Sequence, residues 1–305
     1  CCDGWGRDAL SWAAESGCSA TVGVLLGAKA DWRRMDGEGK ASGNYCFQGG
    51  HQEAWEALVL WAADDERRHR PQIPKPETFN QEYLTSKLVY QGDRLLDAVG
   101  GPVMMGWETP LMRAHAEELL PAPGLRVLNV GFGLGIIDSF LQERKPALHV
   151  IVEAHPDVLA EMERRGWMAH PRVVVLRGRW QDVDLSEYQF DGIFFDTYEE
   201  TYADLRQWHQ QVPSLMAPRG TYSFFNGIAP YNIFFHAVYC RIAQLDLGEA
   251  GLSTRFLKVP VNELGIPWGE ATKYWTFKTY YLPVCRKAEI QEGSIEVVVS
   301  VTDSV

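Results

Sequence analysis

The chain has 305 residues and a mass of 34.4 kDa, enough for one large domain with a small one or for two modest domains. Its content of 46% hydrophobic, 23% charged and 12% aromatic residues excludes disordered, collagen-like and coiled-coil chains. The chain has 40 Asp and Glu residues and 29 Lys and Arg residues, so its formal net charge is -11. This charge argues against a protein whose main role is to bind the phosphate backbone of nucleic acids, and it favours a basic or guanidinium-bearing partner.

An internal repeat opens the chain. The Asp-Gly pairs at Asp3 and Asp36 are 33 residues apart, and the same offset superposes Gly17 on Gly50. This period is typical of ankyrin arrays, and residues 3–31 resemble one repeat: a turn, an Ala-rich helix, a Gly turn and a second helix. The second copy is more degenerate. We expect residues 1–70 to form a small all-α ankyrin segment of about two repeats, truncated or supported by the rest of the chain; the alternative is two unrelated helical hairpins.

A proline-rich linker and one helix come next. Pro71, Pro74 and Pro76 cannot all lie in a helix or a central strand, so the linker is placed at residues 71–80. Apolar residues recur at helical spacing over residues 82–99, which predicts a helix that ends at the Gly-Gly-Pro of residues 100–102.

The remainder, residues 81–305, reads as an α/β domain. Short β-branched or aromatic runs alternate with amphipathic stretches, which indicates a parallel sheet flanked by helices. Two later runs are expected to close this sheet as an antiparallel pair, and residues 294–301 read as strand or disorder. The expected parallel strands are residues 126–130, 147–153, 173–176, 190–196 and 221–226, and the expected pair is 254–259 with 274–283.

A Gly-rich turn follows the first of these strands, at Gly131, Gly133 and Gly135. Glycines let the backbone approach a ligand closely, and the N-terminus of the next helix favours negative groups. Glu153 ends the second strand, where a carboxylate accepts hydrogen bonds from ribose hydroxyls. Dinucleotides and S-adenosylmethionine share this pattern, but a nicotinamide fingerprint is missing and residues 178–182 (GRWQD) resemble the adenine-binding turn of methyltransferases. S-adenosylmethionine is therefore favoured, with S-adenosylhomocysteine as its product.

No run approaches the roughly 20 apolar residues of a membrane span, and no signal-peptide pattern opens the chain, so a cytoplasmic or nuclear protein without a membrane partner is expected. The chain begins at Cys1 rather than Met, which suggests a fragment. Its six cysteines have neither a Cys-x-x-Cys pair nor a His at metal spacing. We interpret them as reduced, mostly buried thiols and expect no metal site.

Five motifs together carry a family resemblance: WETPLM (107–112), VLNVGFGLG (127–135), IVEAH (151–155), RGRWQDV (177–183) and FDGIFFDTY (190–198). They resemble guanidinoacetate methyltransferase and, with an ankyrin segment in front, the type IV protein arginine methyltransferases, which modify the internal δ nitrogen of arginine. The resemblance implies a Rossmann-like class I S-adenosylmethionine-dependent methyltransferase fold. It also implies a protein substrate, a ribosomal protein, and an ankyrin segment that docks it or braces the catalytic domain.

Acidic residues suit a guanidinium, which stays charged and presents a planar fork of donors to carboxylates. Glu108 and Asp196 match the substrate-binding carboxylates of the family, and Asp196 is the better candidate for accepting the proton lost on methylation. The alternatives are a helix cap for Asp196 and a solvated loop acid for Glu108. An Asp-Thr-Tyr sequence from Asp196 also argues against a nucleic acid as the substrate.

The resemblance implies further contacts, for each of which simple packing is the alternative. Asn129 stands where many methyltransferases have an acid. Substrate contacts are expected from Trp107, Tyr198, Asn226 and Gly227, and cofactor contacts from Met112, Gly131, Phe132, Gly133, Gly135, Glu153, Ala154, Trp180, Gln181 and Asp196.

The leading hypothesis is a protein arginine δ-nitrogen (N5) methyltransferase. A small-molecule guanidino methyltransferase is the second hypothesis, although a small metabolite needs no docking surface. The third is an ankyrin adaptor with an inactive methyltransferase-like domain, against which the intact acids Glu108, Glu153 and Asp196 argue.

Overall fold

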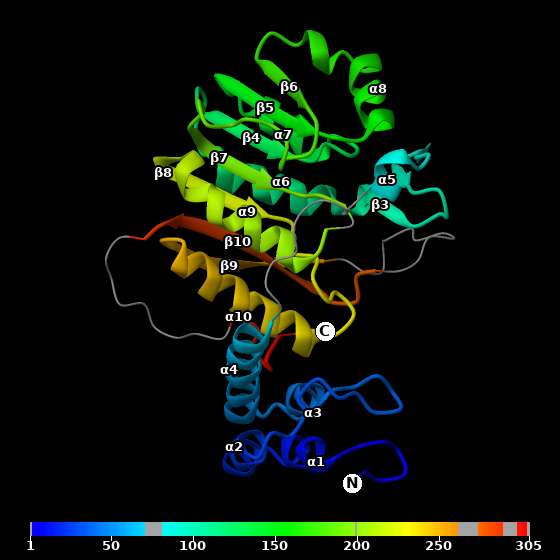
Figure 1. The fold of residues 1–305 in the computed structure, drawn as a ribbon, viewed down its shortest axis with the longest axis vertical. Coiled ribbons are helices and arrows are strands. Elements are labelled where there is room, and N and C mark those ends of the chain that lie inside the picture. Colours follow the sequence, from blue (N-terminus) through cyan, green and yellow to red (C-terminus); the bar gives the residue numbers. More distant parts are fainter. Residues whose placement is uncertain (1, 71–80, 199, 262–273, 289–297, 304–305) are drawn as a thin grey trace.

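A seven-stranded mixed sheet lies at the centre of the computed structural model, which describes residues 2–70, 81–198, 200–261, 274–288 and 298–303. The strand order is β6-β5-β4-β7-β8-β10-β9 (Figure 1). Neighbours from β6 to β8 are parallel, and β10 is antiparallel to β8 and β9, which confirms the expected Rossmann-like sheet closed by an antiparallel pair. The strands are β4 (Arg126–Val130), β5 (Leu148–Glu153), β6 (Val173–Arg177), β7 (Phe190–Phe195), β8 (Met216–Phe224), β9 (Leu252–Pro260) and β10 (Thr279–Lys287).

Helices cover both faces of this sheet, as its continuous apolar strands require. Alternate residues of β4 enter different cores: Val127 packs with α6, α7 and α8, and Leu128 packs with α9 on the opposite face. The covering elements are α6 (Thr109–Leu119), α7 (Ile136–Glu143), α8 (Pro156–Arg164), α9 (Tyr202–Leu215), α10 (Ile233–Glu249) and the short 3-10 turns η1 (Gly106–Glu108) and η2 (Trp167–Ala169). No helix in the described part of the chain has the length and apolarity that crossing a membrane requires.

The N-terminal residues form two helix pairs, α1 (Ala9–Glu15) with α2 (Ser19–Gly27) and α3 (Ser42–Gly49) with α4 (Gln52–His69). The turns before the pairs repeat each other: Asp3 Oδ1 accepts from the amides of residues 5 and 7, and Asp36 Oδ1 accepts from those of residues 38 and 40. The internal repeat is therefore visible in the backbone. Its assignment to ankyrin repeats, and the division at residues 70 and 81, stay predictions.

These helices share one hydrophobic core with the α/β part of the chain. Trp55 of α4 is fully buried, and its ring centroid lies 5.9 Å from that of Phe234 in α10. The Trp55 indole donates to the carbonyl of Val299, 2.6 Å away near the C-terminus. In Figure 1 α10 lies between the sheet and the N-terminal helices. The two parts of the chain therefore stabilise each other.

A buried ion cluster joins the same elements. Asp246 of α10, 3% exposed, accepts from both terminal nitrogens of Arg70 at 2.6 and 2.9 Å and from Arg67 at 3.0 Å. Burial alone would raise the pKa of Asp246, but these partners outweigh it and lower the pKa. The carboxylate therefore stabilises the fold above the ordinary Asp pKa, and this contribution is lost as the pH falls through the lowered value.

Asp246→Asn is expected to lower the free energy of unfolding by about 3 kcal/mol at pH 7, because two arginines lose a buried counter-charge. Chemical denaturation measures the loss. Glu249→Gln is the matched control, since Glu249 also pairs with Arg67 but is 66% exposed, and it is expected to cost less than about 1 kcal/mol. Equal losses in the two variants would contradict this account.

The helix predicted over residues 82–99 is wrong. The structure has a short α5 (Gln81–Thr85) and then a three-stranded antiparallel sheet of β1 (Val89–Gln91), β2 (Arg94–Leu96) and β3 (Pro102–Met105). Gly92, at φ 63°, turns the chain between β1 and β2. A Gly-Asp pair between two β-prone runs is a hairpin signal, and the helical spacing of the apolar residues concealed it.

Two smaller expectations about strands are not met. The last expected strand, 274–283, begins only at Thr279, and residues 298–301 form bends and a turn rather than a strand. The predicted linker at residues 71–80 and residues 294–297 of the predicted tail strand lie outside the described residues.

Candidate functional site

The Gly-rich turn leaves β4 at the carboxyl edge of the sheet. Gly131 has φ 93° and Gly133 has φ 54°, conformations that favour glycine. A Cβ on Gly131 would lie 1.9 Å from the carbonyl oxygen of Asp196, so the turn and the end of β7 meet backbone to backbone. Gly135, at φ 70°, then caps the N-terminus of α7. Because these glycines have no side chains, the space beside the turn is open to a ligand, and Gly131 and Gly133 line a cavity there.

Glu153 lies beside this turn, at the end of β5. Its Oε1 accepts from the amides of Ala154 at 2.8 Å and His155 at 2.7 Å, and its Oε2 accepts from the amide of Phe132 at 2.9 Å. Burial raises the pKa of Glu153, and these backbone hydrogen bonds oppose the rise. The carboxylate therefore joins β5 to the Gly-rich turn and faces the cavity that both line.

A cavity of about 480 Å³ opens along this edge of the sheet. A volume of several hundred Å³ suits a small-molecule cofactor. Residues from every predicted cofactor motif meet there with the predicted substrate acids. The predicted residues that line it are Glu108, Gly131, Gly133, Glu153, Ala154, Trp180, Gln181, Asp196, Tyr198 and Gly227.

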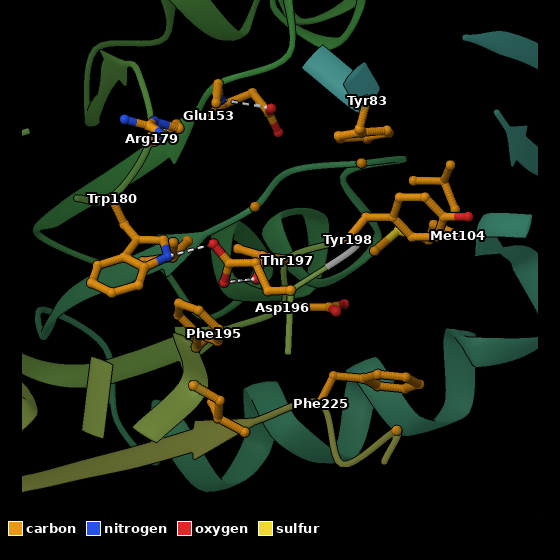
Figure 2. Close-up of a pocket in the computed structure, with 18 of the residues that line it drawn as sticks. Tyr83, Met104, Glu153, Arg179, Trp180, Phe195, Asp196, Thr197, Tyr198 and Phe225 are labelled. Carbon is orange, nitrogen blue, oxygen red and sulfur yellow. Dashed lines mark hydrogen bonds between the residues drawn. The ribbon is translucent and has the colours of Figure 1, made fainter. Parts of the chain in front are cut away.

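One end of the cavity is organised by Glu200. Its Oε1 accepts from the Trp180 indole at 2.7 Å and from the Gln181 amide at 3.2 Å, and its Oε2 accepts from Thr197 at 2.5 Å (Figure 2). Gln181 Oε1 is buried and has no hydrogen-bond partner among the described residues. A buried acceptor beside an indole fits the exocyclic amino group of adenine, and with the open Gly-rich turn this arrangement fits S-adenosylmethionine.

Two further carboxylates line the cavity: Glu108 of η1, which is buried, and Asp196 at the end of β7, which is half-buried. Glu108 is 3% exposed, and Figure 2 shows Asp196 near the middle of the cavity. Burial raises the pKa of Asp196 to about 7; burial and the charge of Asp196 raise the pKa of Glu108 to about 8. Two acids that resist ionisation together form a site for a cation, because a bound positive charge stabilises both carboxylates.

Five predicted site residues do not line the cavity. Met112 and the Phe132 ring are fully buried in the core beneath the sheet, and Gly135 packs on that ring. The Asn226 side chain donates to the Tyr281 carbonyl at 2.9 Å, while its backbone amide donates to the Tyr280 hydroxyl. The Asn226 side chain therefore supports the wall of the cavity and does not line it. Trp107 packs on Tyr274, with ring centroids 5.6 Å apart.

Residues that the sequence did not indicate complete the walls. Tyr83 of α5 and Met104 of β3 lie beside Tyr198 on one side of the cavity (Figure 2), and the Tyr83 and Tyr198 ring centroids are 5.0 Å apart. Tyr198 also donates to Asp97 Oδ2 at 3.1 Å. Tyr83 and Asp97 come from residues 82–99, which the sequence misassigned as one helix. Glu200 and Tyr274 carried no local motif at all.

Asn129, where many methyltransferases have an acid, is fully buried below the Gly-rich turn. Its amide donates to the Gly131 carbonyl at 2.9 Å and to Asp138 Oδ1 at 2.8 Å. Asn129 therefore holds the turn in place. Within the described residues, no group of three His, Cys, Asp or Glu side chains is arranged to bind a metal ion.

Comparison with known sequences identifies related proteins. A family model described as guanidinoacetate N-methyltransferase matches residues 74–286. The protein arginine N-methyltransferase 2 of Aspergillus oryzae is 44% identical over 217 residues, 69% of this chain and 52% of that protein. The protein of the same name from Cryptococcus neoformans is 33% identical over 324 residues, 94% of this chain and 88% of that protein. This chain spans about half the length of several curated relatives that it matches.

Among solved structures, spermidine synthase from Thermotoga maritima covers 74% of this chain at 12% identity with a TM-score of 0.47, and this chain covers 84% of it.

Proposed function

Since this chain belongs to the guanidinoacetate N-methyltransferase family and is similar to proteins named protein arginine N-methyltransferase 2, we propose that it methylates arginine in a protein substrate, at the internal δ nitrogen. The observation that supports this proposal best is the pair of carboxylates, buried Glu108 and half-buried Asp196, which lines the same cavity as the Gly-rich turn. A guanidinium is the side chain whose charge and planar donors suit two carboxylates at once.

The two acids would orient and activate the arginine. Each accepts from a terminal nitrogen, which draws the positive charge onto those groups and returns lone-pair character to the δ nitrogen. S-adenosylmethionine, when bound, supplies the methyl group: its carbon–sulfur bond breaks as the bond to the δ nitrogen forms, and the electron pair stays on sulfur in S-adenosylhomocysteine. Asp196, whose pKa near 7 suits proton transfer, accepts the proton that the δ nitrogen loses.

The pH dependence of kcat/KM for an arginine peptide is expected to report this pair. Both carboxyls must ionise to bind a guanidinium, and their pKa values of about 7 and 8 predict an increase of at least about tenfold between pH 6 and 8.5. Initial rates at subsaturating peptide measure it. Glu108→Gln removes one of the two ionisations, so its increase is expected to be about tenfold and smaller than that of the wild type. A pH-independent rate in the wild-type protein would contradict the assignment.

The N-terminal helices are proposed to dock the protein substrate or to brace the catalytic domain. By resemblance the substrate is a ribosomal protein, and the protein acts in the cytoplasm or the nucleus. Two exposed aromatic side chains of the helical segment, Trp5 at 72% and Trp12 at 46%, suit protein contacts. Because the helices share a core with α10, deleting residues 1–70 would also destabilise the enzyme, so point substitutions test docking more cleanly.

A further inference from the structure

Tyr274 lies in the segment before β10 and lines the cavity beside Glu108. Its hydroxyl hydrogen-bonds to Glu108 Oε1, which also accepts from the backbone amide of Met105 at 3.2 Å. Glu108 Oε2 accepts no hydrogen bond from the described residues. Protein donors thus occupy one oxygen of this carboxylate and leave the other for a ligand in the cavity.

The direction of these hydrogen bonds follows from the groups involved. In the hydrogen bond between Tyr274 and Glu108 the phenol hydroxyl is the donor. The ionised Glu108 can only accept, so the phenol hydrogen points to it. Tyr274 therefore donates to Glu108, and the Trp107 ring packs against the Tyr274 ring. The packing of the two rings, with centroids 5.6 Å apart, supports the same orientation.

We propose that Tyr274 is a positioning residue that leaves Glu108 a single oxygen for the arginine and thereby determines which nitrogen is methylated. This inference rests on the proposed function. A carboxylate with two free oxygens can bind either edge of a guanidinium, including the edge with the internal nitrogen. A carboxylate with one free oxygen accepts from one terminal nitrogen only. The edge with the internal nitrogen then falls to Asp196, which accepts no side-chain hydrogen bond from the described residues.

The groups around Glu108 determine how its pKa changes when the Tyr274 hydroxyl is removed. Burial and the charge of Asp196 disfavour the ionised form, whereas the hydrogen bonds from Tyr274 and Met105 favour it. The charges of Glu108 and Asp196 also act on the buried phenol of Tyr280, which is neutral and adds no charge. Without the Tyr274 hydroxyl, Glu108 is expected to ionise at higher pH, and its Oε1, which then accepts only from the Met105 amide, can also accept from the arginine.

Tyr274→Phe tests this role with two measurements on the full chain. Carbon-13 NMR titration of the Glu carboxyls, with the Glu108 signal assigned by Glu108→Gln, is expected to show a rise of about one pH unit in the Glu108 pKa. Mass spectrometry of methylated Gly-Gly-Arg-Gly-Gly is expected to find δ-methylarginine alone for the wild type. For Tyr274→Phe, at least about a tenth of the product is expected to carry the methyl group on a terminal nitrogen.

Tyr281→Phe is the matched control. Tyr281 is 1% exposed and donates to Asp303 Oδ2 at 2.8 Å, so this variant also loses a buried Tyr–carboxylate hydrogen bond, but away from the cavity. It is expected to keep the wild-type Glu108 pKa and product. An unchanged Glu108 pKa in Tyr274→Phe, or a product that stays on the δ nitrogen, overturns the inference. A wild type that methylates no arginine peptide overturns the proposed function instead, while the titration still decides whether Tyr274 holds Glu108.

Discussion

Asp196→Asn is expected to lower kcat for arginine methylation by about 1000-fold. The substitution removes the proton acceptor and half of the charge that binds the guanidinium, and each such group is worth about 100- to 1000-fold. The affinity for S-adenosylmethionine, measured by calorimetry, is expected to stay within a few fold, because the Gly-rich turn and the Glu200 cluster are unchanged. Turnover at the wild-type rate would remove Asp196 from the mechanism.

The same variant is expected to be more stable than the wild type in alkaline solution. Burial raises the pKa of Asp196 to about 7, so its contribution to stability is present below the ordinary Asp pKa and is lost as the pH rises through 7. At pH 8.5 the neutral amide avoids this cost, and a rise in Tm of about 5 °C is expected. Asp64→Asn, at a surface acid that is 60% exposed, is the control for both measurements and is expected to match the wild type.

Gly131→Ala is expected to abolish cofactor binding and to destabilise the protein by about 4 kcal/mol or more. A Cβ at this position would lie 1.9 Å from the Asp196 carbonyl oxygen, and neither backbone can move without breaking the pairing of β4 with β7. The positive φ of 93° adds strain to any side chain. Thermal unfolding and calorimetric titration with S-adenosylmethionine measure the two losses.

Gly124→Ala separates the clash from the strain. Gly124 has a similar φ of 81°, but a Cβ there meets nothing within 4 Å. It is expected to cost only about 1–2 kcal/mol, which is the conformational strain alone, and to leave cofactor affinity unchanged. If Gly131→Ala cost no more than Gly124→Ala, the close approach of the turn to β7 would not matter to the fold.

The sheet and the cofactor turn were predictable because their signals are local. A run of β-branched residues such as those of β4 and β5 predicts a buried strand wherever it lies in the chain. The glycines after β4 and the acid at the end of β5 are 22 positions or fewer apart along the sequence, so both were visible in it. The predicted cofactor residues at the turn, at Glu153 and at residues 180–181 therefore line one cavity.

The remaining walls depend on contacts that no local pattern records. Tyr274 meets Glu108 across 166 positions of sequence, and Tyr198 meets Asp97 across 101. The apolar residues at helical spacing over residues 82–99 do not share one buried face, because Leu88 and Leu95 are buried but Val89 and Val99 are 48% and 92% exposed. Gly92, at φ 63°, turns the chain between β1 and β2 instead. Asn226 follows β8, but its side chain donates to the Tyr281 carbonyl behind the cavity wall.

The most direct test of the account is the position of the transferred methyl group. The protein is incubated with methyl-labelled S-adenosylmethionine and cell extract, and the labelled species and nitrogen are identified by mass spectrometry. We expect label in protein, as arginine monomethylated on the δ nitrogen, and none from Asp196→Asn. Label found only in small metabolites, or only on the terminal nitrogens of arginine, would contradict the proposed function.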